Sequence, residues 1–445
     1  MHHPIVRSPS TSKSAGASPA RVATASLVGT ASEYYDFFLY GTAAALVFNR
    51  LYFPASSPLA ATLASLATFA VGFVARPIGA VIFSHIGDRY GRRIGLIYTI
   101  VLMGVASGVI GLLPTHASIG VAAPLALVFL RLCQGLAAGG EWGGAVVLSM
   151  EHAPPRLRPL YGAIPMLGSP IGQLLGTGFF TVVALLPDPD FFSWGWRIPF
   201  LVSFGLLAIG LWVRLKVDES PMFVASKAEE DCAGGNGSGV TTRSPLIEVM
   251  RKDWPRILLG SAAAFIGIGG YFLMTTFMMS YGTTTLGLSR NLVLQASAIS
   301  AFVELIVIAI AGILSPKYGP WQVCMFGCVS TIVVAGPCTL AIGSGSSGAI
   351  VLGIVVVIGC VSIPFAPIGA LLASMFPTRT RYSGTAVSFN ISSAVGGATP
   401  LLATAVMSLV DGQLWMVGVL VAMVAVVSIV GLLGIRIQMR RLTYL

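Results

Sequence analysis

Charged residues are scarce in this sequence. Only 9% of its 445 residues are Asp, Glu, Lys or Arg, whereas 55% are hydrophobic and the mean hydropathy is +0.86. A soluble domain carries about 25% charged residues, so this composition excludes one. The chain also lacks a Walker loop, a dinucleotide-binding fingerprint and an HExxH motif. We therefore expect no enzyme and no ATPase, and any uphill process must draw on an ion gradient or a separate energy source.

Cysteine usage gives no sign of disulfides or of a metal. Five of the six cysteines fall in apolar runs, and Cys232 falls in a polar loop. Neither location favours disulfide bonds. Cys324 and Cys328 share a helix face, but no His or acidic residue is near them in the sequence, so a metal site is not expected there. We predict that the protein uses no cofactor.

Long apolar runs dominate what remains. A run of about 18 or more apolar residues is typical of a membrane-spanning helix, and runs of this length are too long for barrel strands. The sequence predicts an all-α integral membrane protein with twelve spans, at residues 22–48, 58–83, 94–113, 119–149, 160–186, 196–216, 256–281, 291–315, 321–342, 347–375, 383–409 and 413–435.

The basic residues fall mostly on one side of these spans. A net charge of +10 would suggest nucleic-acid binding in a soluble domain. Here Lys and Arg concentrate in the loops on one face, which the positive-inside rule assigns to the cytoplasm. The bilayer, and not nucleic acid, is therefore the expected partner. We predict a multi-pass protein of the plasma (cytoplasmic) membrane, and the even number of spans places both termini in the cytoplasm.

The polar segments divide the chain into two halves of six spans. We expect the following organisation: residues 1–21 a disordered cytoplasmic tail, 22–216 an N-terminal six-helix bundle, 217–255 a cytoplasmic linker with a short amphipathic helix, 256–435 a C-terminal six-helix bundle, and 436–445 a cytoplasmic tail. The halves echo each other, because Arg156-Leu-Arg158 precedes the fifth span and Arg379-Thr-Arg381 the eleventh. Duplicated halves are typical of transporters whose binding site lies at the midplane between them.

Ionisable residues inside spans are costly and are therefore functional candidates. Glu33, Asp36 and Tyr40 share one face of the first span. Asp36 lies roughly 20 Å from the inner end of its span, and Arg131 in the fourth span lies at about the same depth. This predicts an Asp36–Arg131 pair, with Glu33 as the surplus carboxyl that takes up and releases a proton. The alternative is a structural ion pair that only locks the two helices.

Three further charges within spans have two interpretations each. Glu141, near the inner surface with Glu151, either pairs with loop arginines or meets the substrate. Arg76 either extends to the inner surface or faces a cavity, where it would bind a substrate carboxylate. Glu304 in the eighth span is either a second proton or substrate contact, or a protonated acid bonded to a backbone carbonyl.

The stretch from Ser84 to Arg93 interrupts two apolar runs. Its charges and glycines predict a tight polar turn on the cytoplasmic side. It is either a topology anchor or a gating loop. The second interpretation is favoured by Asp88, because an acid among arginines adds nothing to orientation.

These residues resemble a known family. Asp88-Arg89-Tyr90-Gly91-Arg92-Arg93 resembles the loop between helices two and three of the major facilitator superfamily. The segments 33–41, 131–142, 196–200, 218–223 and 376–384 resemble the metabolite:proton symporter family within it, whose members import citrate, oxoglutarate, shikimate and proline or betaine. Two departures from the pattern are Ser84 in place of glycine and the degenerate second-half loop at Pro316. The resemblance implies that Asp88 meets the start of the eleventh span, near Ser383, and latches the halves.

The residues and the resemblance together predict proton-coupled uptake of a small organic metabolite bearing a carboxylate, by alternating access, in a monomer. The alternatives are proton-coupled export and a sensor that binds solute without transport. We assign proton coupling to Glu33, Asp36 and Arg131. The predicted substrate contacts are Tyr40, Arg76, Arg131, Gln134, Tyr271, Glu304 and Asn390. The predicted gating residues are Asp88, Arg89, Arg92, Arg93, Glu141, Glu151 and Arg156.

Overall fold

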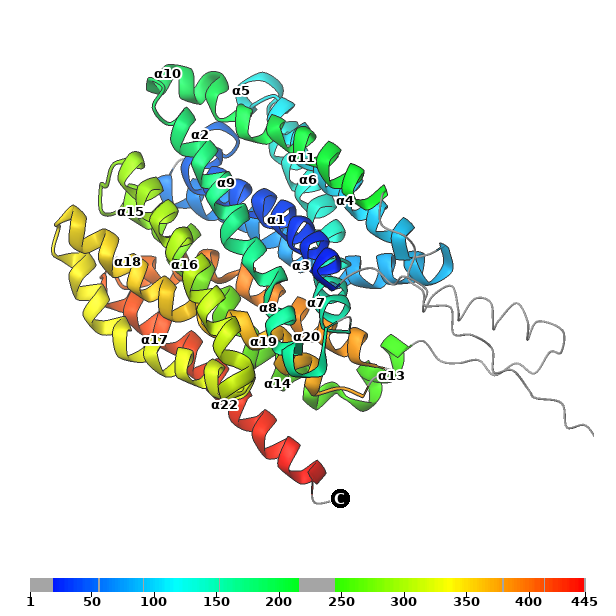
Figure 1. The fold of residues 1–445 in the computed structure, drawn as a ribbon. Helices are drawn as coiled ribbons and strands as arrows, with labels where there is room; N and C mark the ends of the chain where they lie inside the picture. The colour runs from blue at the N-terminus through cyan, green and yellow to red at the C-terminus, as the bar shows by residue number, and fades with distance from the viewer. Residues whose placement is uncertain are drawn as a thin grey trace, which may run out of the picture.

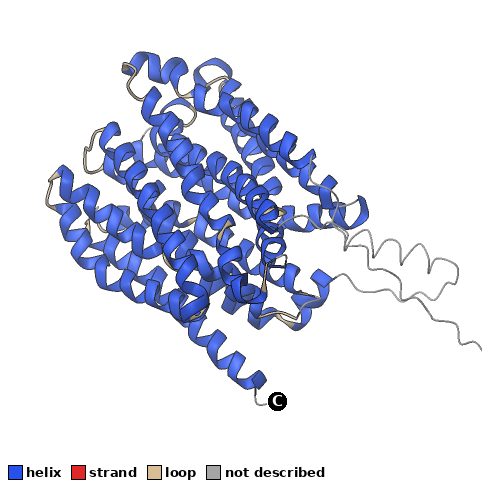
Figure 2. Cartoon of the chain, viewed as in Figure 1, coloured by secondary structure: helices blue, strands red, loops and turns tan. Residues whose placement is uncertain are grey.

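Helices account for all regular structure in the part of the chain that the computed structural model describes (Figures 1 and 2). The described residues are 19–54, 57–90, 92–151, 153–215, 245–377, 380–411 and 413–443. The all-α membrane fold predicted from the sequence is confirmed. Ten helical stretches are long and apolar enough to cross a membrane, and Ile97–Leu112 adds a shorter apolar helix. The first helix, which carries Glu33 and Asp36, completes the twelve.

The first half begins with α1 and closes with α11. In chain order its spans are α1 (Pro19–Ala43) continuing through η1 (Ala44–Phe48) and α2 (Asn49–Leu51); α3 (Pro58–Tyr90); α4 (Arg92–Leu112); α6 (Ala122–Gly139) with α7 (Trp142–Glu151); η2 (Pro155–Leu157), α8 (Arg158–Ala163), η3 (Pro165–Leu167) and α9 (Gly168–Val183); and α11 (Arg197–Leu215). Short connecting elements are α5 (His116–Ile119), α10 (Asp188–Asp190) and η4 (Phe191–Gly195).

The second half follows the short helix α13 (Pro245–Lys252), which lies where the amphipathic helix is predicted. That α13 rests on the membrane surface stays a prediction. The spans are α14 (Trp254–Phe265) with η5 (Ile266–Gly270), η6 (Leu273–Phe277) and α15 (Met278–Thr284); α16 (Arg290–Tyr318); α17 (Pro320–Gly343); α18 (Ser347–Ser362) with α19 (Phe365–Ser374); α20 (Arg381–Gly397) with α21 (Thr399–Leu409); and α22 (Trp415–Thr443). The helix α22 continues past the predicted start of the tail at residue 436.

The breaks between and within the spans take three forms. The turn predicted over Ser84–Arg93 is wrong in extent, because α3 stays helical to Tyr90 and α4 begins at Arg92. Helical backbone hydrogen bonds are the cheapest way to satisfy polar groups near the bilayer. In the second half, Gly319 alone separates α16 from α17, with a φ of +90° that glycine adopts without strain. Pro165 and Pro364 interrupt the fifth and tenth spans, at η3 and between α18 and α19.

Within each half the spans pack closely, and a few pairs hold the halves together. The pairs α3 with α6, α1 with α9 and α4 with α11 build the first half. Between halves, α3 packs on α20, α9 on α16, α8 on α19 and α7 on α20. Figure 1 shows the two halves, blue to green and light green to red, lying side by side.

Glycines allow α3 and α6 to approach backbone to backbone. A Cβ at Gly135 would overlap the backbone of Gly72, and one at Gly139 would overlap the backbone of Arg76. The small residues on this face of α6 therefore form a packing surface. This contact fixes where Arg76 and Arg131 emerge from their helices.

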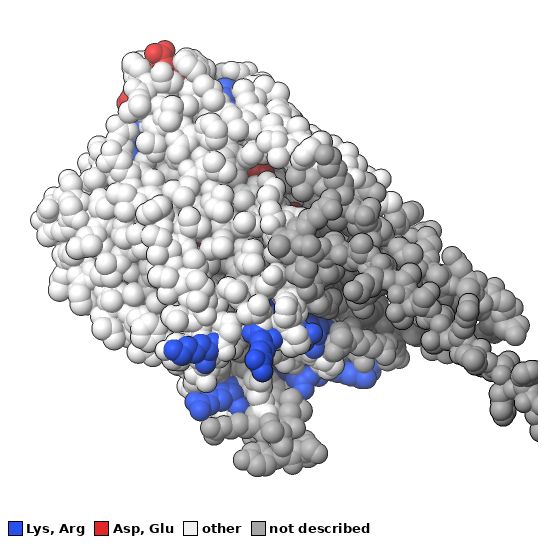
Figure 3. Space-filling model, viewed as in Figure 1, with Lys and Arg blue, Asp and Glu red and all other residues white. Residues whose placement is uncertain are grey.

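The two ends of the molecule differ in the charged residues that they expose. Figure 3 shows Lys and Arg side chains gathered at the lower end, near the C-terminal helix, and acidic side chains at the upper end. The surface between them is almost free of charge. The exposed basic residues include Arg156, Arg158, Lys252, Lys317 and Arg436. An uncharged band between charged ends fits a bilayer.

Gly135→Ala should destabilise the protein by about 1–3 kcal/mol, because its methyl group overpacks the contact between α3 and α6. The thermal unfolding midpoint of the purified protein measures this. Gly178→Ala is the matched control, because nothing lies within 4 Å of its Cβ position. Equal midpoints for the two variants would contradict the packing account.

Candidate functional site

Aromatic rings from both halves fill the interface at its centre. Phe73 of α3 packs on Phe272 with ring centroids 4.9 Å apart, Phe38 on Tyr271 at 5.6 Å, and Tyr34 on Phe365 at 6.3 Å. Arg76 and Ser169 also line the small cavity left between these rings. Its volume of about 10 Å³ is no more than one water molecule needs. The space between the halves is therefore closed in this structure.

A buried ion pair lies beside this aromatic layer. The Arg76 Nη2 donates to Glu33 Oε1 at 2.8 Å, and the two side chains are only 2% and 1% exposed. Arg76 Nε also donates to Asn390 Oδ1 at 3.3 Å, and Asn390 Nδ2 donates to the Gly139 carbonyl at 3.1 Å. Arg76 thus joins α1 and α3 of the first half to α20 of the second.

The predicted Asp36–Arg131 pair is wrong. No ion pair joins these two described side chains; Asp36 instead accepts a hydrogen bond of 2.8 Å from the Ser203 hydroxyl. The depth of a residue in the membrane does not determine the direction in which its side chain points around the helix axis. Asp36 points toward α11, whereas the Arg131 guanidinium lies against aromatic rings of α1 and α3. Arg76 is likewise not extended toward the membrane surface, because Glu33 and Asn390 hold it inside.

Arg131 sits in an aromatic cage within the first half. Its guanidinium lies 4.3 Å from the Tyr40 ring centroid and 4.8 Å from that of Phe37, and it donates to Gln134 Oε1 at 3.1 Å. Such cation–π contacts stabilise a desolvated cation by about 2 kcal/mol or more. Tyr40 itself donates to Thr68 at 2.7 Å. Of the predicted substrate contacts, Tyr40, Gln134 and Arg131 therefore form a network that lines neither described cavity.

Glu304 forms the second buried acidic cluster. It accepts a hydrogen bond of 3.2 Å from Ser169 Oγ of α9 and one from the Tyr271 hydroxyl, which also contacts Gln173. Gln173 in turn donates to Ser297 Oγ of α16 at 3.0 Å. Hydroxyls from both halves, and not a backbone carbonyl, satisfy this carboxyl. Tyr271 and Arg76 both line the small cavity between the halves.

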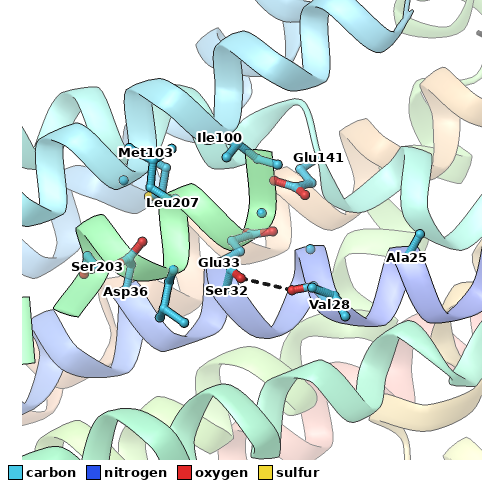
Figure 4. Close-up of a pocket in the computed structure, with 14 residues that line it drawn as sticks. Ala25, Val28, Ser32, Glu33, Asp36, Ile100, Met103, Glu141, Ser203 and Leu207 are labelled. Atoms are coloured by element: carbon cyan, nitrogen blue, oxygen red, sulfur yellow. Dashed lines mark hydrogen bonds between the residues drawn. The ribbon is translucent and has the colours of Figure 1, made fainter. Parts of the chain in front are cut away.

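A separate cavity lies on the other side of α1, between α1, α4 and α11. Glu33, Asp36 and Glu141 all line it, and its volume is about 30 Å³. In Figure 4 the carboxyl groups of Glu33 and Glu141 point toward one another, and Asp36 lies further along α1 beside Ser203. Three carboxyl-bearing residues thus line one cavity.

The predicted gating residues are only partly covered by the structure. The side chains of Asp88, Arg89, Arg92, Arg93 and Glu151 lie outside the described residues, Glu141 is buried, and Arg156 is exposed. Beside the Arg76 site the halves also meet through Trp142 and Phe389, which stack with ring centroids 3.3 Å apart. At the end of the interface where α16 begins, Arg290 pairs with Asp188 at 3.2 Å and donates to the Ala184 carbonyl at 3.0 Å. The halves are thus bridged at the centre and at that end.

Several site residues went unnoticed in the sequence. Ser169 and Gln173 on α9, Ser203 on α11 and Ser297 on α16 complete the hydrogen bonds of the buried acids. Isolated hydroxyls and amides are common in membrane helices, so their types alone carry little signal. Only the knowledge that these residues lie opposite a buried acid on a neighbouring helix would have identified them, and the sequence does not give it.

Two helical halves around a buried, charged midplane site define a secondary transporter. The comparisons agree. The Major Facilitator Superfamily model matches residues 26–400. The chain is 39% identical over 387 residues to the "Inner membrane metabolite transport protein YhjE" of Escherichia coli, covering 85% of each chain. It is 37% identical to the "Shikimate transporter" of E. coli, over 88% of this chain and 89% of the relative.

A solved structure shares the fold. That of the "proton:xylose symporter XylE" superposes with a TM-score of 0.72 at 17% identity, covering 93% of this chain and 94% of that one. The chain therefore belongs to the Major Facilitator Superfamily. It is a multi-pass membrane transporter of metabolites and not an enzyme, as the resemblance in its motifs implied.

Arg76→Met should destabilise the closed protein by about 3–5 kcal/mol, because it leaves the Glu33 carboxylate buried without its counter-charge. Adding Glu33→Met should restore much of this loss, since both charges are then gone. Thermal unfolding of the purified single and double variants measures the coupling. Arg158→Met, at an exposed arginine, is the control. A double variant as unstable as the sum of the singles would contradict the pairing.

Proposed function

We propose that the protein is a proton-coupled symporter that takes up a small carboxylate-bearing metabolite. The buried Glu33–Arg76 pair at the closed interface between the halves carries this proposal. Arginine is suited to bind a carboxylate, and its present partner is itself a carboxylate. A substrate carboxylate would therefore compete with Glu33 for Arg76.

Charge neutrality couples the proton to the solute. Burying an unpaired charge is strongly unfavourable, so the halves close readily only over a neutral site. The Glu33–Arg76 pair is neutral as a unit, and the space beside it is closed in this structure. Adding a carboxylate alone would leave a net negative charge, and adding one proton to Glu33 removes it. One proton per substrate carboxylate then allows the loaded transporter to close.

Neutral Glu33 also releases Arg76. A protonated carboxyl loses most of its attraction for the guanidinium, so Arg76 can turn to the substrate while Asn390 holds its Nε. Asp36 lies three residues after Glu33 on α1 and accepts a hydrogen bond from Ser203 of α11. It is the second acid assigned to proton coupling. Arg131 would act on it electrostatically from within its cage and not as a paired partner.

The cavity lining fits a solute with an apolar or ring-shaped body. Tyr34, Phe37, Phe73, Phe272 and Phe365 surround the space next to Arg76. A carboxylate on Arg76 would place the rest of the solute against these rings. Tyr271, with the Glu304 carboxyl behind it, would hydrogen-bond a hydroxyl or amine of the solute. The relative that transports shikimate handles a carboxylate of this kind.

The membrane orientation follows from the charged ends. The basic end would face the cytoplasm under the positive-inside rule, with both termini on that side. The protein would work as a monomer in the plasma membrane, with no cofactor beyond the proton gradient. Asp88 would latch the halves from this side, since α20 begins at Arg381 and a helix N-terminus attracts an anion by about 0.3–1 kcal/mol. The arginines at 89, 92 and 93, with Glu151 and Arg156, would complete that latch.

Uptake into proteoliposomes tests the proposal. The probes are shikimate, oxoglutarate, citrate and glycine betaine, each with an imposed inward proton gradient. We expect at least one carboxylate to accumulate, a protonophore to abolish accumulation, and the methyl ester of the same solute not to be transported. Carboxylate accumulation that is unchanged by the protonophore would refute proton symport.

Glu33→Gln should abolish accumulation yet keep solute exchange, because glutamine imitates the protonated carboxyl in the loaded site. The empty variant cannot close, since Arg76 lacks a counter-charge. Counterflow and net uptake of the same solute measure the two modes. Asp190→Asn, an exposed acid on α10, is the matched control and should behave as wild type. Normal accumulation by Glu33→Gln would exclude Glu33 as the coupling group.

A further inference from the structure

The cavity between α1, α4 and α11 has no role in the solute pathway described above. It shares no lining residue with the cavity between the halves. Along α1 it extends from Asp36 to Ala25, roughly 16 Å at 1.5 Å per residue. It therefore reaches from the level of the buried acids toward the basic end of the molecule, where α1 begins.

Glu33 lines this cavity, and its two carboxylate oxygens differ in their partners. Its Oε1 is held by Arg76 at 2.8 Å, on the side of the interface. Its Oε2 is buried and has no hydrogen-bond partner among the described residues, although the side chain is only 1% exposed. An unpaired buried carboxylate oxygen is costly and points to a missing donor, such as a water molecule.

The space beside Glu33 can hold that donor. A volume of about 30 Å³ has room for about two waters. Figure 4 shows the Glu141 carboxyl facing Glu33 across it. The remaining wall is mainly apolar, with Ile100, Met103 and Leu207 labelled in the figure. A short water chain between two carboxyls in an apolar wall is an arrangement that passes protons and excludes larger solutes.

We propose that this cavity is a proton-transfer chamber, in which Glu141 exchanges protons with Glu33 through one or two waters. The proton leaves Glu33 Oε2, crosses the water and reaches the Glu141 carboxylate, from which it passes to the solution at the basic end. The solute leaves between the halves, on the opposite side of α1. This inference rests on the proposed proton symport and adds a separate route for the proton.

Few ionisable side chains surround the chamber. Asp36 is the third acid that lines it, and Arg76 reaches Glu33 from α3. Arg131 acts on Asp36 electrostatically from α6. The described lining residues of α4 and α11 contain no titratable side chain. Glu141 also has a further interaction partner in the chain. Glu33 and Glu141 are therefore the two acids whose carboxyls face each other.

Glu141→Gln tests the route. We expect net proton-driven uptake to slow by about a hundredfold or more, the lower end of the range for losing a proton-transfer group. Exchange of the same solute at equal pH on both sides should stay within about twofold of wild type, because exchange needs no proton release at Glu33. The probe is the carboxylate that the wild type accumulates best among shikimate, oxoglutarate and citrate. Glu141→Asp should restore part of the net rate.

The outcomes separate the chamber from a structural role. A merely structural role would lower net uptake and exchange together, and that result would overturn the proposal. Unchanged net uptake by Glu141→Gln would overturn it as well. The pH change of a weakly buffered lumen, followed during solute efflux, gives a direct readout: proton release should lag behind solute release in the variant only.

Water access gives a test that needs no solute. Ser32→Cys places a thiol on the chamber wall, and its S–H stretching band should shift quickly to the S–D position in D2O, whereas the band of Val74→Cys on the outer surface of α3 should shift far more slowly. The unsubstituted protein is the blank for the native cysteines. A Ser32→Cys thiol that exchanges as slowly as the Val74→Cys thiol would overturn the hydrated chamber. If the wild type shows no proton-driven uptake but the Ser32→Cys thiol exchanges quickly, the proposed symport fails while the hydrated chamber is supported.

Discussion

The rest of the structure depends on one buried ion pair, between Glu33 and Arg76. Both side chains are removed from solvent, so neither charge is tolerable without the other. The pair keeps the empty interface neutral, and the aromatic rings of both halves can then close over it. Asn390 extends the pair to the second half, so the charge state of α1 is transmitted directly to the contact between the halves.

The helix α1 separates two environments. One face meets the rings and the closed space between the halves, where a metabolite would bind. The opposite face meets the small cavity with Glu141 and Asp36. Glu33 lines the second of these spaces and is joined to the first through Arg76, which holds its Oε1. A carboxyl in this position can respond to a proton from one side and an anion from the other, which is the physical requirement for coupling.

The fold was largely predictable from the sequence, because the bilayer demands long apolar helices and leaves few alternatives. The acids and arginines of the site were predictable as well, since charges within spans are rare and stand out. Their pairing was not. Asp36 turns to Ser203 of α11, whereas Arg131 packs on aromatic rings of α1 and α3, and the glycine contact of α3 with α6 places both arginines. Hydroxyl partners such as Ser203 carried no distinctive signal.

The central claim is that solute binding and protonation of Glu33 occur together. Infrared difference spectroscopy of the reconstituted protein tests it directly, with shikimate or another accumulated carboxylate as the probe. The account predicts that adding the solute produces a carboxylic-acid C=O stretching band, and that this band disappears in Glu33→Gln. Solute binding without a new carboxylic-acid band, or with the same band in Glu33→Gln, would contradict the account.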